Sequence, residues 1–167
     1  MEHNWYALWV KSRHEFIARD DLAGRGIETF LPAVTKVQQW RDRKKNVVFP
    51  IFPGYLFVSL GRSAQEFQRA IRTRGSVGLI SLEPGHPTPV QPEEITALKA
   101  VVASGQPFDV YPHFQTGVRV KIRRGPLQGA EGVLAKKDER DVFFVNVEIL
   151  GRSIGLRISA NDIEQAS

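Results

Sequence analysis

The alternation of apolar and polar positions first predicts strands mixed with helices. Residues 5–10, "WYALWV", are apolar on both faces, which indicates a buried central strand. Two helices are expected to begin at Ser12 and Ser63, because a Glu follows each serine by three residues, as in a capping box. A third helix is expected from Pro92 in its first turn to a stop at Gly105. This order of elements is typical of an α+β domain in which helices pack on a sheet.

A two-stranded arm with a basic tip is expected between the first two helices, over about residues 34–51. Residues 49–60, "FPIFPGYLFVSL", then combine aromatic rings with two prolines and a glycine. The Pro-Gly step ends the arm and begins the next strand. Alternation along that strand predicts Tyr55 and Phe57 on one face and their neighbours on the other. One of the two faces must pack on the helices. The sequence alone does not settle whether Phe57 lies on that face or on the other.

The pattern changes to period two in the last third of the chain. Alternating stretches such as "VRVKI" and "VFFVNVEI" are separated by glycine turns, which predicts five short strands. We therefore expect an α+β amino-terminal domain at 1–104, a proline-containing linker at 105–112, and a small all-β, SH3-like barrel at 113–167.

Composition favours a binding protein over an enzyme. The net charge is +5, and residues 1–82 alone hold 13 Lys and Arg against 7 Asp and Glu, which weakly favours contact with phosphates. The chain has no cysteine, its four histidines match no zinc spacing, and no nucleophile or phosphate-loop motif is present, so no enzyme, cofactor or metal is expected. Without an apolar run of 18 residues or a signal peptide, we expect a cytoplasmic protein that does not contact the membrane.

Several motifs resemble the NusG family of transcription elongation factors across nearly the whole chain. They are "WYALWVKSRHE", "FLP", "FPGYLFV" and the KOW-like "GVRVKIRRGPLQGAEGVL", in that order. The resemblance implies an antiparallel sheet with helices followed by a five-stranded KOW barrel. It also implies that the first domain binds the clamp helices of the largest RNA polymerase subunit and suppresses pausing or termination.

The resemblance gives the aromatic strand a role in polymerase binding. Rigid aromatic rings bury a large area at low entropic cost and often dominate interfaces. The polymerase-binding residues are therefore expected to be Trp9, Phe52, Pro53, Tyr55 and Phe57.

Specialised paralogues of the RfaH, UpxY or LoaP type imply a second contact, with the non-template DNA strand. Lys11, Arg13, His14 and Arg74 occupy the matching positions, and "VKSRHE" looks like these operon-specific antiterminators.

The KOW domain of the family recruits a ribosomal protein or termination factor Rho. We expect Leu150 and Arg152 to contact this partner and the chain to be a monomer. However, Leu150 stands where general members carry an aromatic residue, and Leu127 replaces the usual Phe of the KOW loop. Two alternatives stay open: a housekeeping NusG-type factor that links polymerase to Rho or the ribosome, and a KOW-containing RNA-binding protein of the ribosomal type.

Overall fold

The computed structural model describes residues 2–166 and separates the chain into two compact units, of which the first ends at Pro89 and the second begins at Val90. Among the described residues, none of the helices has the length and apolar character needed to cross a membrane.

The first unit is built on a four-stranded antiparallel sheet. Its strand order is β2-β5-β1-β6, so the two long apolar strands occupy the centre, as the sequence predicted for residues 5–10. The strands are β1 (His3–Val10), β2 (Thr29–Phe30), β5 (Tyr55–Gly61) and β6 (Ser76–Leu79).

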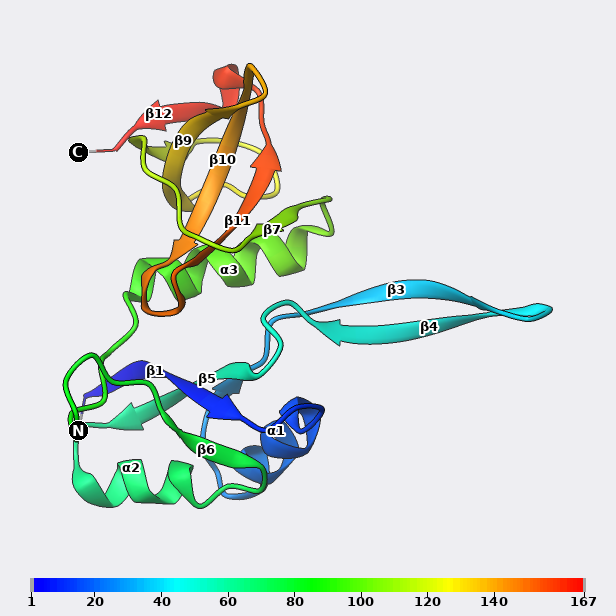
Figure 1. Cartoon of the computed structure of the whole chain (residues 1–167). Coiled ribbons are helices and arrows are strands. Elements are labelled where there is room, and N and C mark those ends of the chain that lie inside the picture. Colours follow the sequence, from blue (N-terminus) through cyan, green and yellow to red (C-terminus); the bar gives the residue numbers. More distant parts are fainter. Residues whose placement is uncertain (1, 167) are drawn as a thin grey trace. The chain divides into compact units, whose positions relative to one another are not determined.

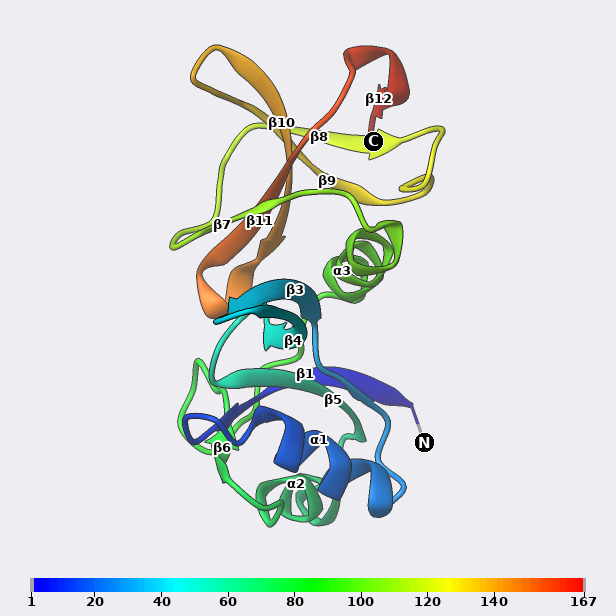
Figure 2. The same ribbon diagram turned by 90° about the vertical axis from the view of Figure 1, so that its right-hand side faces the viewer.

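Helices α1 (Glu15–Gly24) and α2 (Ala64–Ile71) lie on the same face of this sheet (Figure 2). Their small and apolar side chains pack with alternate residues of β1 and β5, because side chains two apart in a strand share a face. The core comprises Tyr6, Leu8, Val10, Ala18, Leu22, Ile27, Leu56, Val58, Leu60 and Ala70. Phe67 of α2 adds an edge-to-face contact with the Tyr6 ring at 5.2 Å.

The two capping boxes have different outcomes. Ser63 caps α2 as predicted, since its hydroxyl accepts a hydrogen bond from the Glu66 N–H at 3.2 Å. The prediction for Ser12 is wrong, because α1 begins later, with His14 in the capping position and no side-chain cap. Glu15 is instead buried and turned towards another segment, and its part in the site is described below.

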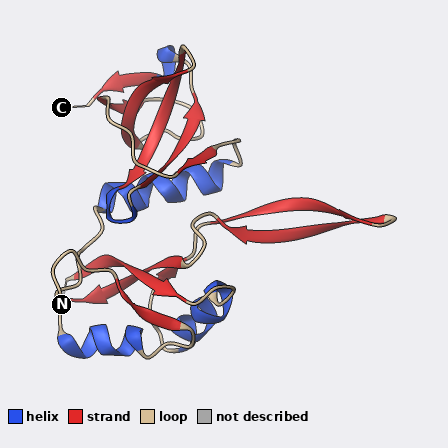
Figure 3. Cartoon of the chain, in the orientation of Figure 1, coloured by secondary structure: helices blue, strands red, loops and turns tan. Residues whose placement is uncertain are grey.

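The predicted arm is present as a separate two-stranded ribbon, which extends away from the four-stranded sheet (Figures 1 and 3). It consists of β3 (Ala33–Trp40) and β4 (Arg43–Pro50), paired along their whole length.

The second unit is an all-antiparallel sheet of six strands that curls into a small barrel (Figure 1). Its order is β12-β8-β9-β10-β11-β7. The strands are β7 (Asp109–Tyr111), β8 (Val118–Ile122), β9 (Glu131–Lys137), β10 (Arg140–Val147), β11 (Arg152–Arg157) and β12 (Ile163–Gln165), with short 3-10 turns η1 (Glu148–Leu150) and η2 (Ala160–Asp162).

Helix α3 (Pro92–Ser104) has the ends that the sequence predicted, with Pro92 in the first turn and Gly105 left-handed at φ 69°. However, it belongs to the second unit, where it packs on β9 and β10. The expected domain boundary at residue 104 therefore differs from the division that the structure shows, at Pro89. The periodicity of the helix defined its buried stripe but carried no information about which partner covers that stripe.

The expected linker at 105–112 also needs correction, because it contains β7, which pairs with β11. A Cβ added at Gly155 would lie 2.9 Å from Cε2 of Tyr111 and 2.8 Å from Cε1 of Phe144. Only a glycine there admits the Tyr111 ring, which meets Phe144 edge-on at 5.2 Å. Strand β7 thus depends on a residue more than forty positions away, which local patterning does not reveal.

Candidate functional site

The segment Phe52–Tyr55 forms a tight turn where the arm returns to the sheet. The Tyr55 N–H donates to the Phe52 carbonyl at 3.0 Å, and Gly54 adopts φ 90°. Pro53 followed by a glycine with positive φ is the pattern of a type II turn. The Pro-Gly step therefore sets the direction in which β5 begins.

Two hydrogen bonds fasten this turn to β1 and α1. The Gly54 carbonyl accepts from the Val10 N–H at 2.9 Å, and the Gly54 N–H donates to Oε2 of Glu15 at 2.8 Å. Glu15 is only 5% exposed, so its carboxylate acts as an internal bracket between helix and turn. Glu15 therefore binds the turn and does not form the predicted capping box with Ser12.

The strand register places the predicted aromatic residues on the face opposite the core. Trp9 lies directly across from Tyr55, and Ala7 across from Phe57. Trp9 is 48% exposed and Pro53 is exposed, whereas Tyr55 is half-buried. We call Trp9, Pro53 and Tyr55 the aromatic edge.

Phe52 and Phe57 take a different place from the aromatic edge, because both are fully buried. The Phe57 ring stacks on Phe30 of β2 at 6.2 Å. The question that the sequence left open is thereby answered: Phe57 faces away from the helices, yet it has no exposed surface. Its position is suited to supporting an aromatic surface and not to forming one.

The four predicted nucleic-acid residues come from two loops that meet although sixty residues separate them. The Lys11 N–H donates to the Gly75 carbonyl at 2.8 Å. Gly75 also lies against His14, since an added Cβ would be 2.6 Å from the His14 Cβ. Lys11, Arg13 and Arg74 are exposed and His14 is half-buried; we call these four residues the basic loop pair.

The Asp21 side chain holds the loop of Arg74 in place through the backbone of that loop. Its Oδ2 accepts from the Arg74 N–H at 2.9 Å and forms an ion pair with Arg25 at 3.4 Å. The Arg74 N–H is the main cause that holds the pKa of Asp21 below its usual range, with help from Arg25. The carboxylate thus orders the loop while the Arg74 side chain remains exposed.

In the second unit, the predicted partner residues flank a tight turn. Leu150 ends η1 and Arg152 begins β11, with Gly151 left-handed between them, and both side chains are partly exposed. Leu127 is only 4% exposed, so the residue of the KOW loop is part of the barrel interior.

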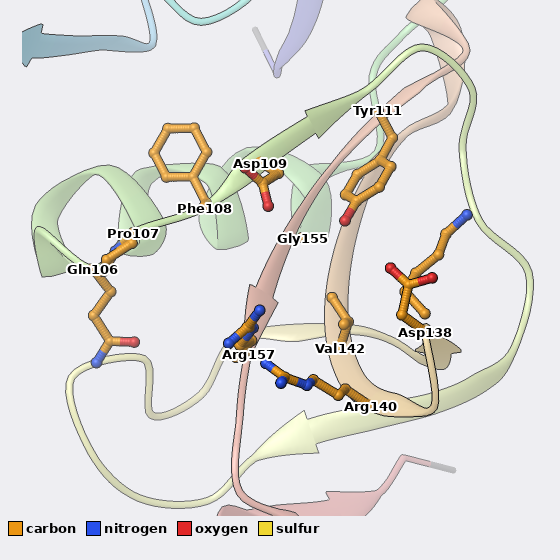
Figure 4. A pocket seen from close by; sticks show the side chains of 11 residues that line it. Gln106, Pro107, Phe108, Asp109, Tyr111, Asp138, Arg140, Val142, Gly155 and Arg157 are labelled. Atoms are coloured by element: carbon orange, nitrogen blue, oxygen red, sulfur yellow. The ribbon is translucent and has the colours of Figure 1, made fainter.

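A polar pocket of about 710 Å³ lies beside β7, where the sequence pattern predicted no site (Figure 4). Lys137, Arg140 and Arg157 line it together with two carboxylates, Asp109 and Asp138. The pocket was missed because one wall is β7, in the segment expected to be a linker. Among the described residues, no group of three His, Asp or Glu side chains is placed to hold a metal ion.

The fold is therefore that of a two-domain protein, in which an antiparallel α+β unit with exposed aromatic rings and cations precedes a small β-barrel. A family model described as "Transcription termination factor nusG" matches residues 3–99. This match covers more than half of the chain, and the chain therefore belongs to the NusG family of transcription factors.

Relatives of this family match the chain from end to end. The transcription termination/antitermination protein NusG of Borreliella burgdorferi is 24% identical over 99% of this chain and 100% of its own length. The protein of the same name from Halalkalibacterium halodurans is 25% identical over 99% of both chains. A solved structure that describes the domain interaction in Thermotoga maritima NusG has the same fold, with a TM-score of 0.53 and 23% identity over 100% of this chain and 99% of that one.

Proposed function

We propose that this NusG-type factor binds RNA polymerase through the aromatic edge, at the clamp helices of the largest subunit, and suppresses pausing or termination. The observation that carries this proposal is the register that sets Trp9 beside Tyr55 on the face opposite the core. Half-exposed rings offer a large apolar area to a partner helix, whereas Phe52 and Phe57 are fully buried and offer none. The hydrogen bond from the Gly54 N–H to Glu15 holds the turn that contains Pro53.

The test is the affinity of the full chain for core RNA polymerase after the change Tyr55→Ala. Removal of a central aromatic contact costs about 2 kcal/mol, which corresponds to a roughly 30-fold weaker complex. Leu82→Ala is a matched control, because Leu82 is 76% exposed and lies outside the aromatic edge. Both variants must show the wild-type unfolding midpoint. Wild-type affinity of a folded Tyr55→Ala protein contradicts the proposal.

The basic loop pair is proposed to contact the single-stranded non-template DNA of the transcribing complex. Three cationic side chains and the His14 ring, gathered from two loops, can contact successive phosphates. For single-strand binding, the logarithm of the affinity falls linearly with the logarithm of the salt concentration. We expect the double change Lys11→Gln, Arg74→Gln to make this slope shallower by about 0.7 for each phosphate contact that is lost. The double change Arg62→Gln, Lys121→Gln removes equal charge elsewhere and is the control. An unaltered salt dependence in the first variant rejects this role.

The second unit is proposed to recruit a ribosomal protein or Rho through Leu150 and Arg152. Both residues border one tight turn, so an apolar and a cationic contact are presented together. Pull-down of purified Rho and of ribosomal proteins is expected to weaken after Leu150→Ala and to persist after Val118→Ala, which truncates an exposed residue of β8. Equal retention by both variants argues against Leu150.

We further propose that the factor serves one or a few operons. The support is Leu150, an aliphatic residue at a position where the general role calls for an aromatic one. Genome-wide occupancy mapping is expected to show signal confined to those operons. Signal over most transcribed genes establishes the housekeeping role instead. The ribosomal-type alternative predicts that co-purification with core polymerase is lost after nuclease treatment.

A further inference from the structure

The β3–β4 arm has two chemically different faces, which its register defines. Trp40 pairs with Arg43, and Lys36 pairs with Val47. Directly opposed residues share a face of an antiparallel ribbon. The face that we call the Trp40 face therefore consists of Val34, Lys36, Gln38, Trp40, Arg43, Lys45, Val47 and Phe49.

The arm also carries five cations and one carboxylate within ten residues, 36–45. Lys36 lies over the Phe49 ring at 5.8 Å on the Trp40 face. Among the described residues, the other four cations form no ion pair. Lys44 projects from the opposite face, whereas Arg41 occupies the tip, where it adopts φ 48°. Positive charge thus surrounds the ribbon on both faces and at its end.

Every residue from Thr35 to Asn46 is exposed, and Trp40 is 59% exposed. A two-stranded ribbon is only marginally stable by itself in water, so a long exposed one is suited to a partner. Charge complementarity identifies that partner as polyanionic, because the ribbon presents cations without local carboxylates other than Asp42.

The distribution of charge favours a duplex over a single strand. A single strand follows one face, whereas a groove of duplex DNA places a phosphate wall on either side of an inserted element. The major groove of B-form DNA admits a two-stranded ribbon, while the major groove of an RNA helix is too narrow. Strands of eight residues extend about 26 Å, which is less than one turn of DNA.

We propose that the β3–β4 arm binds double-stranded DNA in the major groove. The Trp40 face is directed at the base edges, and the five cations neutralise phosphates of both walls. This contact is separate from the basic loop pair, which acts on an unpaired strand.

The test measures binding of the full chain to a 20-base-pair DNA duplex, without polymerase, between 50 and 200 mM salt. Five phosphate contacts predict an affinity that falls about 500-fold across this range. The triple change Arg43→Gln, Lys44→Gln, Lys45→Gln leaves two contacts and predicts a fall of about 12-fold. The control triple change Lys121→Gln, Lys136→Gln, Arg140→Gln removes equal charge from exposed positions of the second unit and should behave as wild type.

Four results overturn the proposal. The first is a wild-type chain that does not bind the duplex at 50 mM salt, and the second is an arm variant with the wild-type salt dependence. The third is an arm variant that loses more affinity for a single strand or an RNA duplex than for the DNA duplex. The fourth is an arm variant that loses binding to polymerase and keeps its binding to the duplex. Because no polymerase is present in the DNA assay, its failure leaves the role of the aromatic edge to be judged by Tyr55→Ala.

Discussion

Glu94 of α3 is expected to make the second unit less stable as the pH rises. Its carboxylate accepts the Glu148 N–H at 3.2 Å where the chain leaves β10. Burial raises the pKa of Glu94 to about 7, and the negative charges of Glu148 and Glu93 act in the same direction. The Glu148 N–H and the charge of Arg119 oppose this rise without cancelling it.

The sign of the effect follows from proton binding. A pKa raised from 4.5 to about 7 means that the folded state holds the proton more tightly than the unfolded chain does. The proton on Glu94 therefore stabilises the folded second unit. This stabilisation is complete below pH 4.5 and is lost as the pH rises through about 7. The full shift corresponds to about 3 kcal/mol, and partial exposure of the carboxylate reduces this to about 1–2 kcal/mol.

The change Glu94→Gln removes the charge and keeps an acceptor for the Glu148 N–H. We expect the variant to exceed the wild type in unfolding free energy by about 1–2 kcal/mol at pH 8 and to match it at pH 4.5. Scanning calorimetry of the full chain is the suitable assay, because all three tryptophans lie in the first unit and fluorescence does not report the second. Glu164→Gln, at an exposed position of β12 that does not act on the pKa of Glu94, is the control.

Two outcomes refute the reasoning about Glu94. A difference between Glu94→Gln and wild type that does not change with pH shows that the effect is not protonation. A variant that is less stable than wild type at pH 8 shows that the charged carboxylate is favoured by its hydrogen bond to the Glu148 N–H.

Three glycine substitutions test other contacts of the structure, and a fourth, Gly78→Ala, is a control. Gly54→Ala should lower the unfolding free energy by about 1 kcal/mol because φ is 90°, whereas Gly78→Ala, with open space around it, should change it little in the same chemical denaturation assay. Gly75→Ala should separate the two loops of the basic loop pair and weaken single-strand binding without altering charge; unchanged binding contradicts their joint action. Gly155→Val should expel the Tyr111 ring and destabilise the second unit by about 1–3 kcal/mol, read as a lower calorimetric midpoint; an unchanged midpoint contradicts the close packing.

Short sequence patterns correctly predicted those features that depend on interactions between residues close together in the chain. The serine at position 63 has a glutamate three residues later, and the hydroxyl does cap α2. The equivalent spacing at Ser12 failed because Glu15 accepts a different hydrogen bond, from the N–H of Gly54 thirty-nine residues away. A capping pattern indicates that a hydrogen bond within the helix end is possible. It does not indicate whether the fold brings another partner close to the same side chain.

The candidate site shows the same division. Alternation along residues 55–61 correctly separated Tyr55 and Phe57 from the core side chains. It did not reveal that Phe57 is covered while Trp9 is half-exposed, because the covering ring, Phe30, comes from a two-residue strand with no periodicity of its own.

By itself, the sequence determined the type and order of most elements, the arm, the turn at Phe52–Tyr55 and the resemblance to the family. These follow from the short-range rules of periodicity, proline, glycine and charge. Tertiary structure alone decided which unit α3 joins, that β7 exists, and that the loops of Lys11 and Arg74 meet. The physical reason is that each depends on a contact between distant segments, whose free energy is gained only when both partners are already folded.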